Sequence, residues 1–187
     1  MKILVAYATA HGSTKEVAQF IGRVLSTYNV DVTVANVVDI QTVEGYDAYV
    51  LGSAIHASLW LQEMCTFFDR FGDPLSMKPM YFWITCIRAL EEDGKKHALQ
   101  YYFDYKLLED YQVQEFAVFT GKLDIREITR QEQWFLAANY DGKLMPGNIH
   151  HDYRDWKAIA AWANNIAIDL ELAPVFETEQ SGDIVSF

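Results

Sequence analysis

Met1-Lys2-Ile3-Leu4-Val5-Ala6-Tyr7-Ala8 opens the chain, followed directly by Thr9-Ala10-His11-Gly12-Ser13-Thr14 and Lys15-Glu16-Val17-Ala18. The apolar run predicts a buried strand, and the residues from Lys15 onward begin a helical pattern. A strand that passes through a short turn into a helix presents free backbone N–H groups and the positive end of the helix dipole at one point. This arrangement predicts a binding site for a phosphate group at residues 9–14.

The turn lacks the features of the two common nucleotide-binding loops. It has no G-x-x-x-x-G-K-S/T motif and no lysine between residues 9 and 14, so nucleoside triphosphate hydrolysis is not expected. It has no G-x-G-x-x-G motif, so a dinucleotide is not expected either. A single phosphate, as on FMN, fits better. A purely structural interpretation stays open, because Ser13 and Glu16 form the S-x-x-E pattern of a capping box.

The composition is that of one globular domain. The 187 residues are 51% apolar and carry a formal net charge of −11. An acidic surface disfavours nucleic acid and anionic membranes as main partners; it is compatible with docking onto a basic protein, or with solubility alone. The apolar run at 3–8 is too short for a signal peptide or a membrane span, so we expect a cytoplasmic protein. Cys65 and Cys86 are not in C-x-x-C spacing and are expected to be buried thiols.

Strand and helix patterns alternate along the chain. After the first strand, β-rich runs are expected at 31–37, 46–52, 79–86 and 114–120, and helical patterns at 14–28, 59–71, 94–108 and 153–172. Such alternation predicts βαβ units with right-handed crossovers. The expected fold is therefore α/β: a three-layer, doubly wound, five-stranded parallel sheet in a single domain at 1–172.

Two segments interrupt this rhythm. The stretch 122–152 is long for a loop in a compact domain, which favours a functional insertion, and it contains Trp134-Phe135-Leu136. The acidic tail 173–187 is expected to be mobile or docked by Phe176 or Phe187. His150-His151 invites a metal interpretation, but adjacent side chains point in different directions and no third ligand is evident, so no metal site is predicted.

Four motifs together resemble the flavodoxin-like superfamily. Thr9-Ala10-His11-Gly12-Ser13-Thr14 resembles its phosphate loop, Ser/Thr-x-Thr-Gly-x-Thr, although His11 stands where a hydroxyl is usual. The other segments resemble the branch that contains the oxygen-independent protoporphyrinogen dehydrogenase. They are Val50-Leu51-Gly52-Ser53-Ala54-Ile55-His56, Phe119-Thr120-Gly121-Lys122-Leu123 and Tyr153-Arg154-Asp155-Trp156. The insertion also lies where that branch carries its long loop.

The resemblance implies a strand order of 2-1-3-4-5 and an FMN site where three loops meet at the carboxyl ends of the strands. The residues that it assigns to FMN are Thr9, Ala10, His11, Gly12, Ser13, Thr14, Ser53, Ala54, Ile55, His56, Ala57, Ile87, Arg88, Ala89 and Leu90. His56 and Trp60 are candidates to touch the flavin, and Trp60 is equally a candidate for packing. Arg88 either lies near the ring, where it would raise the potential, or pairs with Glu91 or Glu92 at the surface. No catalytic residue is predicted.

Three functions are consistent with these residues. The first is an FMN-binding flavoprotein, an oxidoreductase that carries out electron transfer between a donor and a protein or quinone-like acceptor. The second is a quinone-linked protoporphyrinogen IX dehydrogenase of haem biosynthesis; the mixed charges of the insertion disfavour it, and a weak peripheral membrane contact through 122–152 would accompany it. The third is a flavodoxin-shaped interaction module without flavin. The oligomeric state is not predicted.

Overall fold

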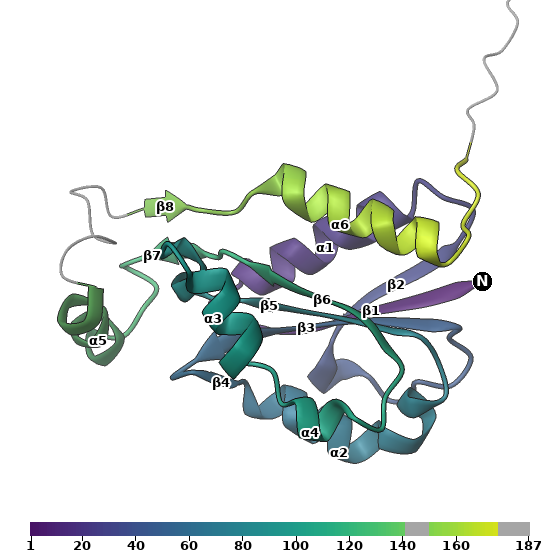
Figure 1. Cartoon of the computed structure of the whole chain (residues 1–187), viewed down its shortest axis with the longest axis horizontal. Coiled ribbons are helices and arrows are strands. Elements are labelled where there is room, and N and C mark those ends of the chain that lie inside the picture. The colour runs from purple at the N-terminus through teal and green to yellow at the C-terminus, as the bar shows by residue number, and fades with distance from the viewer. Residues whose placement is uncertain (141–149, 176–187) are drawn as a thin grey trace, which may run out of the picture.

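The computed structural model describes residues 1–140 and 150–175. Its centre is a parallel sheet with the strand order β2-β1-β3-β5-β6, as Figure 1 shows. The parallel strands are β1 (Lys2–Ala8), β2 (Asp31–Asn36), β3 (Ala48–His56), β5 (Met80–Thr85) and β6 (Val113–Phe119). A short strand, β4 (Leu59–Trp60), pairs antiparallel with the end of β3. When the five parallel strands alone are numbered along the chain, without β4, their order across the sheet is 2-1-3-4-5. This order confirms the predicted fold.

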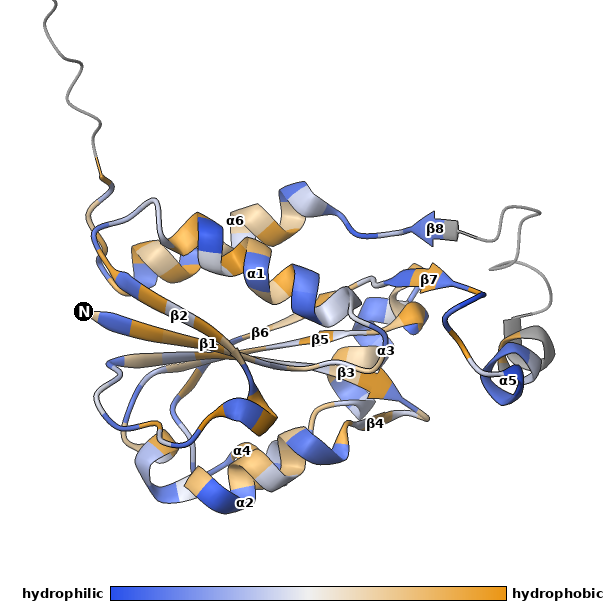
Figure 2. Ribbon diagram, turned by 180° about the vertical axis from the view of Figure 1, so that it is seen from behind, coloured by the Kyte–Doolittle hydropathy of each residue, from blue (hydrophilic) through white to orange (hydrophobic). Residues whose placement is uncertain are grey.

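Helices cover both faces of the sheet and complete the three layers. One face carries α1 (Ser13–Leu25) and α6 (Trp156–Asp169), and the other carries α2 (Gln62–Ser76), α3 (Gly94–Tyr101) and α4 (Tyr105–Leu108). Short 3-10 turns, η1 (Val37–Asp39) and η2 (Ile87–Leu90), follow β2 and β5. Figure 2 shows β1 as largely hydrophobic, whereas α1 and α2 alternate between hydrophobic and hydrophilic residues. This is the pattern of central strands buried on both faces and helices buried on one.

Alternate residues of each strand point into opposite cores. In β1, Leu4, Ala6 and Ala8 pack on the α2 side, while Ile3, Val5 and Tyr7 pack on the α1 side. In β5, the fully buried Trp83 lies against Gly52 of β3, where a Cβ atom would come within 2.0 Å of the indole. Only glycine leaves room for this indole, so the packing of Trp83 requires a glycine at position 52 of β3.

The region after β3 differs from the prediction. Strand β3 continues to His56, turns at Ala57 and Ser58 with φ angles of 49° and 66°, and returns as β4. The helix predicted from residue 59 therefore begins only at Gln62. The reason is tertiary: the Trp60 indole stacks on Phe82 with 4.6 Å between ring centroids, which holds this residue in the hairpin. Packing overrides the helical pattern here.

Other boundaries also shift. The helix predicted over 94–108 is interrupted after Tyr101, and α4 starts anew where the Asp104 carboxylate accepts a hydrogen bond from the backbone N–H of Leu107. Helix α1 ends at Leu25 rather than at residue 28. At the start of α6, the Asp155 carboxylate accepts from the backbone N–H groups of Lys157 and Ala158, so this helix begins at Trp156 rather than at residue 153.

The insertion has structure of its own. It contains β7 (Lys122–Asp124), α5 (Arg130–Tyr140) and β8 (His150–Asp152), and β7 pairs antiparallel with β8. Figure 1 shows all three beyond the end of the sheet at which β1, β3 and β5 finish. The predicted docking of the tail through Phe176 or Phe187 lies outside the described residues. Among the described helices, none is both long and apolar enough to cross a membrane.

Candidate functional site at the carboxyl edge of the sheet

Three segments that the sequence assigned to one site meet at the same edge. Strands β1, β3 and β5 are adjacent and parallel, so the turn after β1, the hairpin after β3 and η2 after β5 all lie at their carboxyl ends. In open α/β sheets this edge is where ligands bind, at the point where the strand order reverses. Here that point lies between β1 and β3.

The turn after β1 is held in shape by its own residues. The Thr9 Oγ1 accepts a hydrogen bond from the Gly12 backbone N–H at 3.0 Å, and the Gly12 carbonyl accepts from the N–H of Glu16 at 3.1 Å. Gly12 has a φ angle of 86°, in the left-handed region that favours glycine. A Cβ atom at Gly12 would meet nothing within 4 Å, so the turn is open on this side.

The structure overturns the capping-box interpretation. Gly12, not Ser13, occupies the cap position of α1, and no side chain caps this helix. Instead, the Glu16 carboxylate pairs with the Arg154 guanidinium, with 2.7 Å between Oε2 and Nη1. Within the described part of the chain, no acceptor pairs with the backbone N–H groups of Ser13, Thr14 and Lys15. An open turn followed by three free amides at a helix start is the donor set that an anion requires.

The Thr14 hydroxyl serves the fold. Its Oγ1 lies 2.6 Å from Thr85 Oγ1, and both side chains are buried. This contact joins the first turn of α1 to the last residue of β5. Both threonine hydroxyls at the ends of the turn thus fix its geometry, and an anion at this site would be held by amides. The sequence motif alone does not show that the threonine hydroxyls hold the turn while the amides are left to bind an anion.

The hairpin after β3 contributes a different surface. Ser53 is fully buried, and its Oγ accepts from the Leu61 backbone N–H at 3.1 Å and donates to the Ala54 carbonyl at 2.9 Å. Ala54 and Ile55 are half-buried, whereas His56 and Ala57 are exposed. The first four of these residues belong to β3, so the expectation of a loop starting at Ser53 is wrong. The side-chain alternation of a strand now decides which of them face the edge.

The segment after β5 is compact. Ala89 is buried, and Ile87, Arg88 and Leu90 are half-buried. The Arg88 Nε lies 3.2 Å from Glu91 Oε2, so the structure shows the surface pairing that the sequence left as one of two alternatives. Packing against α3 is tight here, because a Cβ atom at Gly94 would lie 1.7 Å from the Arg88 carbonyl oxygen.

Trp60 and the two cysteines have packing roles. The Trp60 Nε1 donates to the Tyr102 carbonyl at 2.6 Å, and the ring packs on Phe82, which supports packing over flavin contact. Cys86 is buried, and burial raises the pKa of its thiol to about 11. Cys65 is half-buried rather than buried, and burial again raises its pKa. Burial thus disfavours the thiolate, the reactive form, in both side chains.

The sequence did not predict a cluster of three side chains, Glu132, His11 and His56, that joins the insertion to the edge of the sheet. The Glu132 Oε1 lies 2.9 Å from His11 Nε2, in the turn after β1, and 3.0 Å from His56 Nε2, at the end of β3. Although burial alone would favour the protonated acid, hydrogen bonds from His11 and Thr129 lower the pKa of Glu132 to about 2. The carboxylate is therefore ionised and accepts from both imidazoles. The pattern Thr129-x-x-Glu132 is itself a capping box that marks the start of α5.

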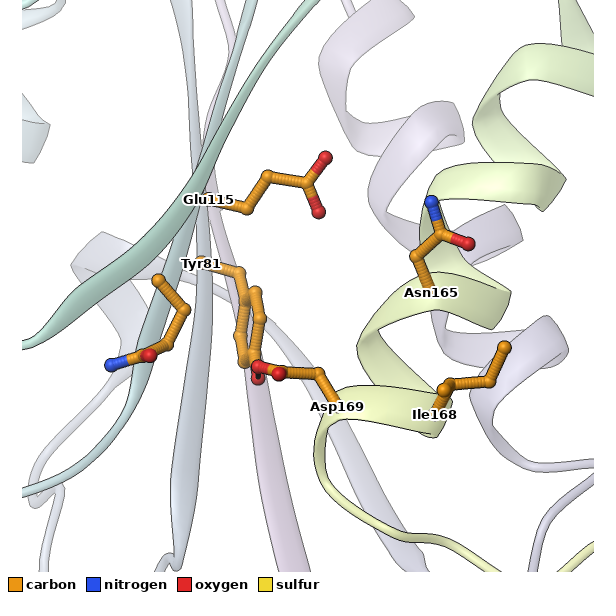
Figure 3. Close-up of a pocket in the computed structure, with 6 residues that line it drawn as sticks. Tyr81, Glu115, Asn165, Ile168 and Asp169 are labelled. Atoms are coloured by element: carbon orange, nitrogen blue, oxygen red, sulfur yellow. Dashed lines mark hydrogen bonds between the residues drawn. The ribbon is translucent and has the colours of Figure 1, made fainter.

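A cavity lies at the other end of the sheet. It has a volume of about 370 Å³ and lies between the amino ends of β5 and β6 and the end of α6, as Figure 3 shows. Its charged residues are acidic: burial, and then the nearby Asp169, raise the pKa of Glu115, and the Tyr81 hydroxyl donates to Asp169. An acidic pocket repels phosphate, so the turn at the opposite edge remains the candidate phosphate site. His150 and His151 lie in β8, and no cluster of ligating side chains in the described residues is arranged to hold a metal ion.

Comparison with known proteins agrees with this geometry. A family model described as flavodoxin domain matches residues 4–137. Protoporphyrinogen IX dehydrogenase (quinone) of Escherichia coli is 23% identical over 172 residues, which cover 89% of this chain and 95% of that protein.

Solved flavodoxin structures resemble the fold. A flavodoxin from Streptococcus pneumonia has a TM-score of 0.57 at 12% identity, covering 90% of this chain and 99% of that one. An archaeal flavodoxin has a TM-score of 0.55 at 15% identity, with 91% and 99% covered. Oxidised flavodoxin 2 from Bacillus cereus has a TM-score of 0.52 at 23% identity, with 65% and 85% covered. At these identities the likeness concerns the fold.

Proposed function

This chain belongs to the flavodoxin-domain family, and we propose that it is a cytoplasmic redox protein that binds FMN at the carboxyl edge of the sheet. The observation that supports this most strongly is the anion site: the open turn at Gly12 and the free amides of Ser13, Thr14 and Lys15. These groups would bind the phosphate of FMN, reinforced by the dipole of α1. No lysine or arginine lies in the turn, so recognition rests on backbone geometry.

The other two segments would hold the ring. The hairpin after β3 and the turn η2 flank the edge between them, and the protein groups there would set orientation and solvent access. When bound, FMN supplies the redox chemistry, because it accepts and donates electrons itself. The Arg88–Glu91 pair contributes no isolated positive charge to this side, which weakens the idea that Arg88 alone raises the potential.

The test is to identify the cofactor and count its electrons. Purified protein is expected to be yellow and to release FMN, not riboflavin or FAD, on denaturation. A redox titration that resolves two one-electron steps would support a carrier that serves a protein acceptor. A single two-electron step would support a quinone-like small-molecule acceptor. Colourless protein that takes up no FMN would overturn the proposal and favour the flavin-free module.

A second candidate function is dehydrogenation of protoporphyrinogen IX with a quinone as acceptor. The observation that favours it is the match to the Escherichia coli enzyme along nearly the full length of both chains. The insertion beyond the flavin edge would then hold the substrate. FMN-loaded protein that fails to oxidise protoporphyrinogen with menaquinone, and also with an artificial acceptor, would remove this candidate while leaving the first intact.

A further inference from the structure

Glu132 connects the insertion to the turn after β1 and to the end of β3, which flank the proposed flavin site at the carboxyl edge of the sheet. It lies in the first turn of α5, and a single oxygen, Oε1, contacts His11 at 2.9 Å and His56 at 3.0 Å. These histidines are separated from Glu132 by 121 and 76 positions and belong to two different strand ends. A carboxylate can only accept, so both Nε2 atoms carry hydrogen and donate to it.

The carboxylate is held in place before it meets the histidines. Its second oxygen, Oε2, accepts from the Thr129 backbone N–H at 2.6 Å, and the Glu132 N–H donates to Thr129 Oγ1 at 3.2 Å. Its side chain is 21% exposed. Surface ion pairs are usually weak because two flexible side chains must be ordered. Here that cost is reduced, since the reciprocal capping contacts already fix the acceptor, and the bonds are charge-assisted.

The polar contacts of Gln133, the residue that follows Glu132, stay within the insertion. The Gln133 Nε2 donates to the carbonyls of Ile125, at 2.9 Å, and Ile128, at 3.2 Å. Within the described part of α5, the side-chain hydrogen bonds that reach the turn after β1 and the hairpin after β3 are those of Glu132. Its carboxylate thus provides the polar connection between this helix and the edge of the sheet.

We propose that Glu132 is a latch that holds helix α5 over the carboxyl edge by bonding His11 and His56 at once. With these hydrogen bonds formed, the start of α5 lies over the edge between the ends of β1 and β3; with them broken, α5 moves away and the edge is accessible. Helix α5 is then a positioned cover for the site. The contacts themselves carry this inference, and only its consequence for flavin rests on the proposed function.

Hydrogen exchange of the flavin-free protein tests the latch. Glu132→Gln keeps the size of the side chain but removes its charge. Loss of the two charge-assisted bonds would speed exchange of the α5 amides about tenfold or more. Amides of α6, which packs beside α1 on the sheet and makes none of these contacts with Glu132, should keep their rates. His56→Gln removes one of the two bonds and should give a smaller increase in the same amides.

Glu127→Gln is the matched control. Glu127 lies in the same insertion, its side chain is exposed, and the substitution makes the same change in charge. In the Glu127→Gln protein, the α5 amides should exchange at the wild-type rate. Unchanged α5 exchange in both Glu132→Gln and His56→Gln, or equal acceleration in Glu127→Gln, would overturn the latch. If Glu132→Gln also speeds exchange of the α6 amides, the substitution has destabilised the whole fold. The result for His56→Gln then decides whether the latch exists.

The consequence for flavin has its own readout. Riboflavin, which carries no phosphate for the Glu132 charge to repel, should leave Glu132→Gln several-fold faster than it leaves the Glu127→Gln control, measured by the recovery of free-flavin fluorescence after dilution. Equal release rates would show that α5 does not gate the site. If the wild-type protein binds no FMN at all, the proposed function is wrong. The hydrogen-exchange experiment still tests the latch, because it uses the flavin-free protein.

Discussion

Gly12→Asp is expected to bind FMN about a hundredfold more weakly than Gly12→Asn, while the two variants bind riboflavin equally. Both side chains have the same shape, and a Cβ atom at this position meets nothing within 4 Å. Both residues also tolerate the left-handed conformation that Gly12 adopts, with a φ angle of 86°. The variants therefore differ by one negative charge beside the amides of Ser13, Thr14 and Lys15.

The magnitude follows from Coulomb's law. Two unit charges 4 Å apart at an effective dielectric constant of about 20 repel by about 4 kcal/mol, and two thirds of this corresponds to roughly a hundredfold in affinity. Fluorescence titration of the apoproteins with FMN and with riboflavin measures it. Thermal unfolding provides the control, because an acidic residue near a helix start is not destabilising and the two melting temperatures should agree. Equal FMN affinities of the two variants would place the phosphate elsewhere.

Gly94→Ala is expected to lower the free energy of unfolding by about 3 kcal/mol, a fall of roughly 6–12 °C in melting temperature. The new Cβ atom would lie 1.7 Å from the Arg88 carbonyl oxygen and 2.8 Å from the Arg88 carbonyl carbon. These are backbone atoms that cannot rotate away, so η2 or α3 must shift. Alanine is the better helix former by about 1 kcal/mol, but this gain is smaller than the cost of the clash.

Gly72→Ala is the matched control for Gly94. It makes the same substitution inside helix α2, where the nearest atom to the new Cβ is the Tyr111 hydroxyl at 3.1 Å, at the end of a side chain. Its stability should change by less than about 1 kcal/mol. Because η2 is one of the three segments of the proposed site, Gly94→Ala should also weaken FMN binding, whereas Gly72→Ala should not. A Gly94→Ala protein as stable as wild type would show that η2 is not tightly packed.

The parts of the fold that the sequence predicted are those that local patterns encode. The apolar run before Thr9 and the amphipathic pattern after Ser13 specify β1, its turn and α1 without reference to the rest of the chain. The hairpin at β4 was missed because a distant aromatic ring decides it: Trp60 stacks on Phe82, and a helical pattern cannot show that contact. The break between α3 and α4 was missed because the cap at Asp104 lies inside an otherwise continuous helical pattern.

The meeting of the three segments at one edge was predicted, but their contacts were not. Three loops follow from the strand order, and the structure brings their segments to one edge. The partner of the Thr14 hydroxyl, Thr85, lies 71 positions away, and no spacing rule connects the two. The cluster around Glu132 needs three segments to meet in space, so Glu132 read from sequence was one acidic residue among several. The capping pattern at Thr129 was the only local signal, and it indicates a helix start, not a contact.

The central claim is that the phosphate of a mononucleotide is bound by the amides at the start of α1. The most direct measurement is the ratio of the dissociation constants of riboflavin and FMN for the wild-type apoprotein, determined side by side in the same buffer by calorimetry. The two ligands share the ring and differ in the phosphate. We expect FMN to bind at least about a hundredfold more tightly, because its phosphate adds two or more charge-assisted hydrogen bonds. Equal dissociation constants, or no binding of FMN, would contradict it.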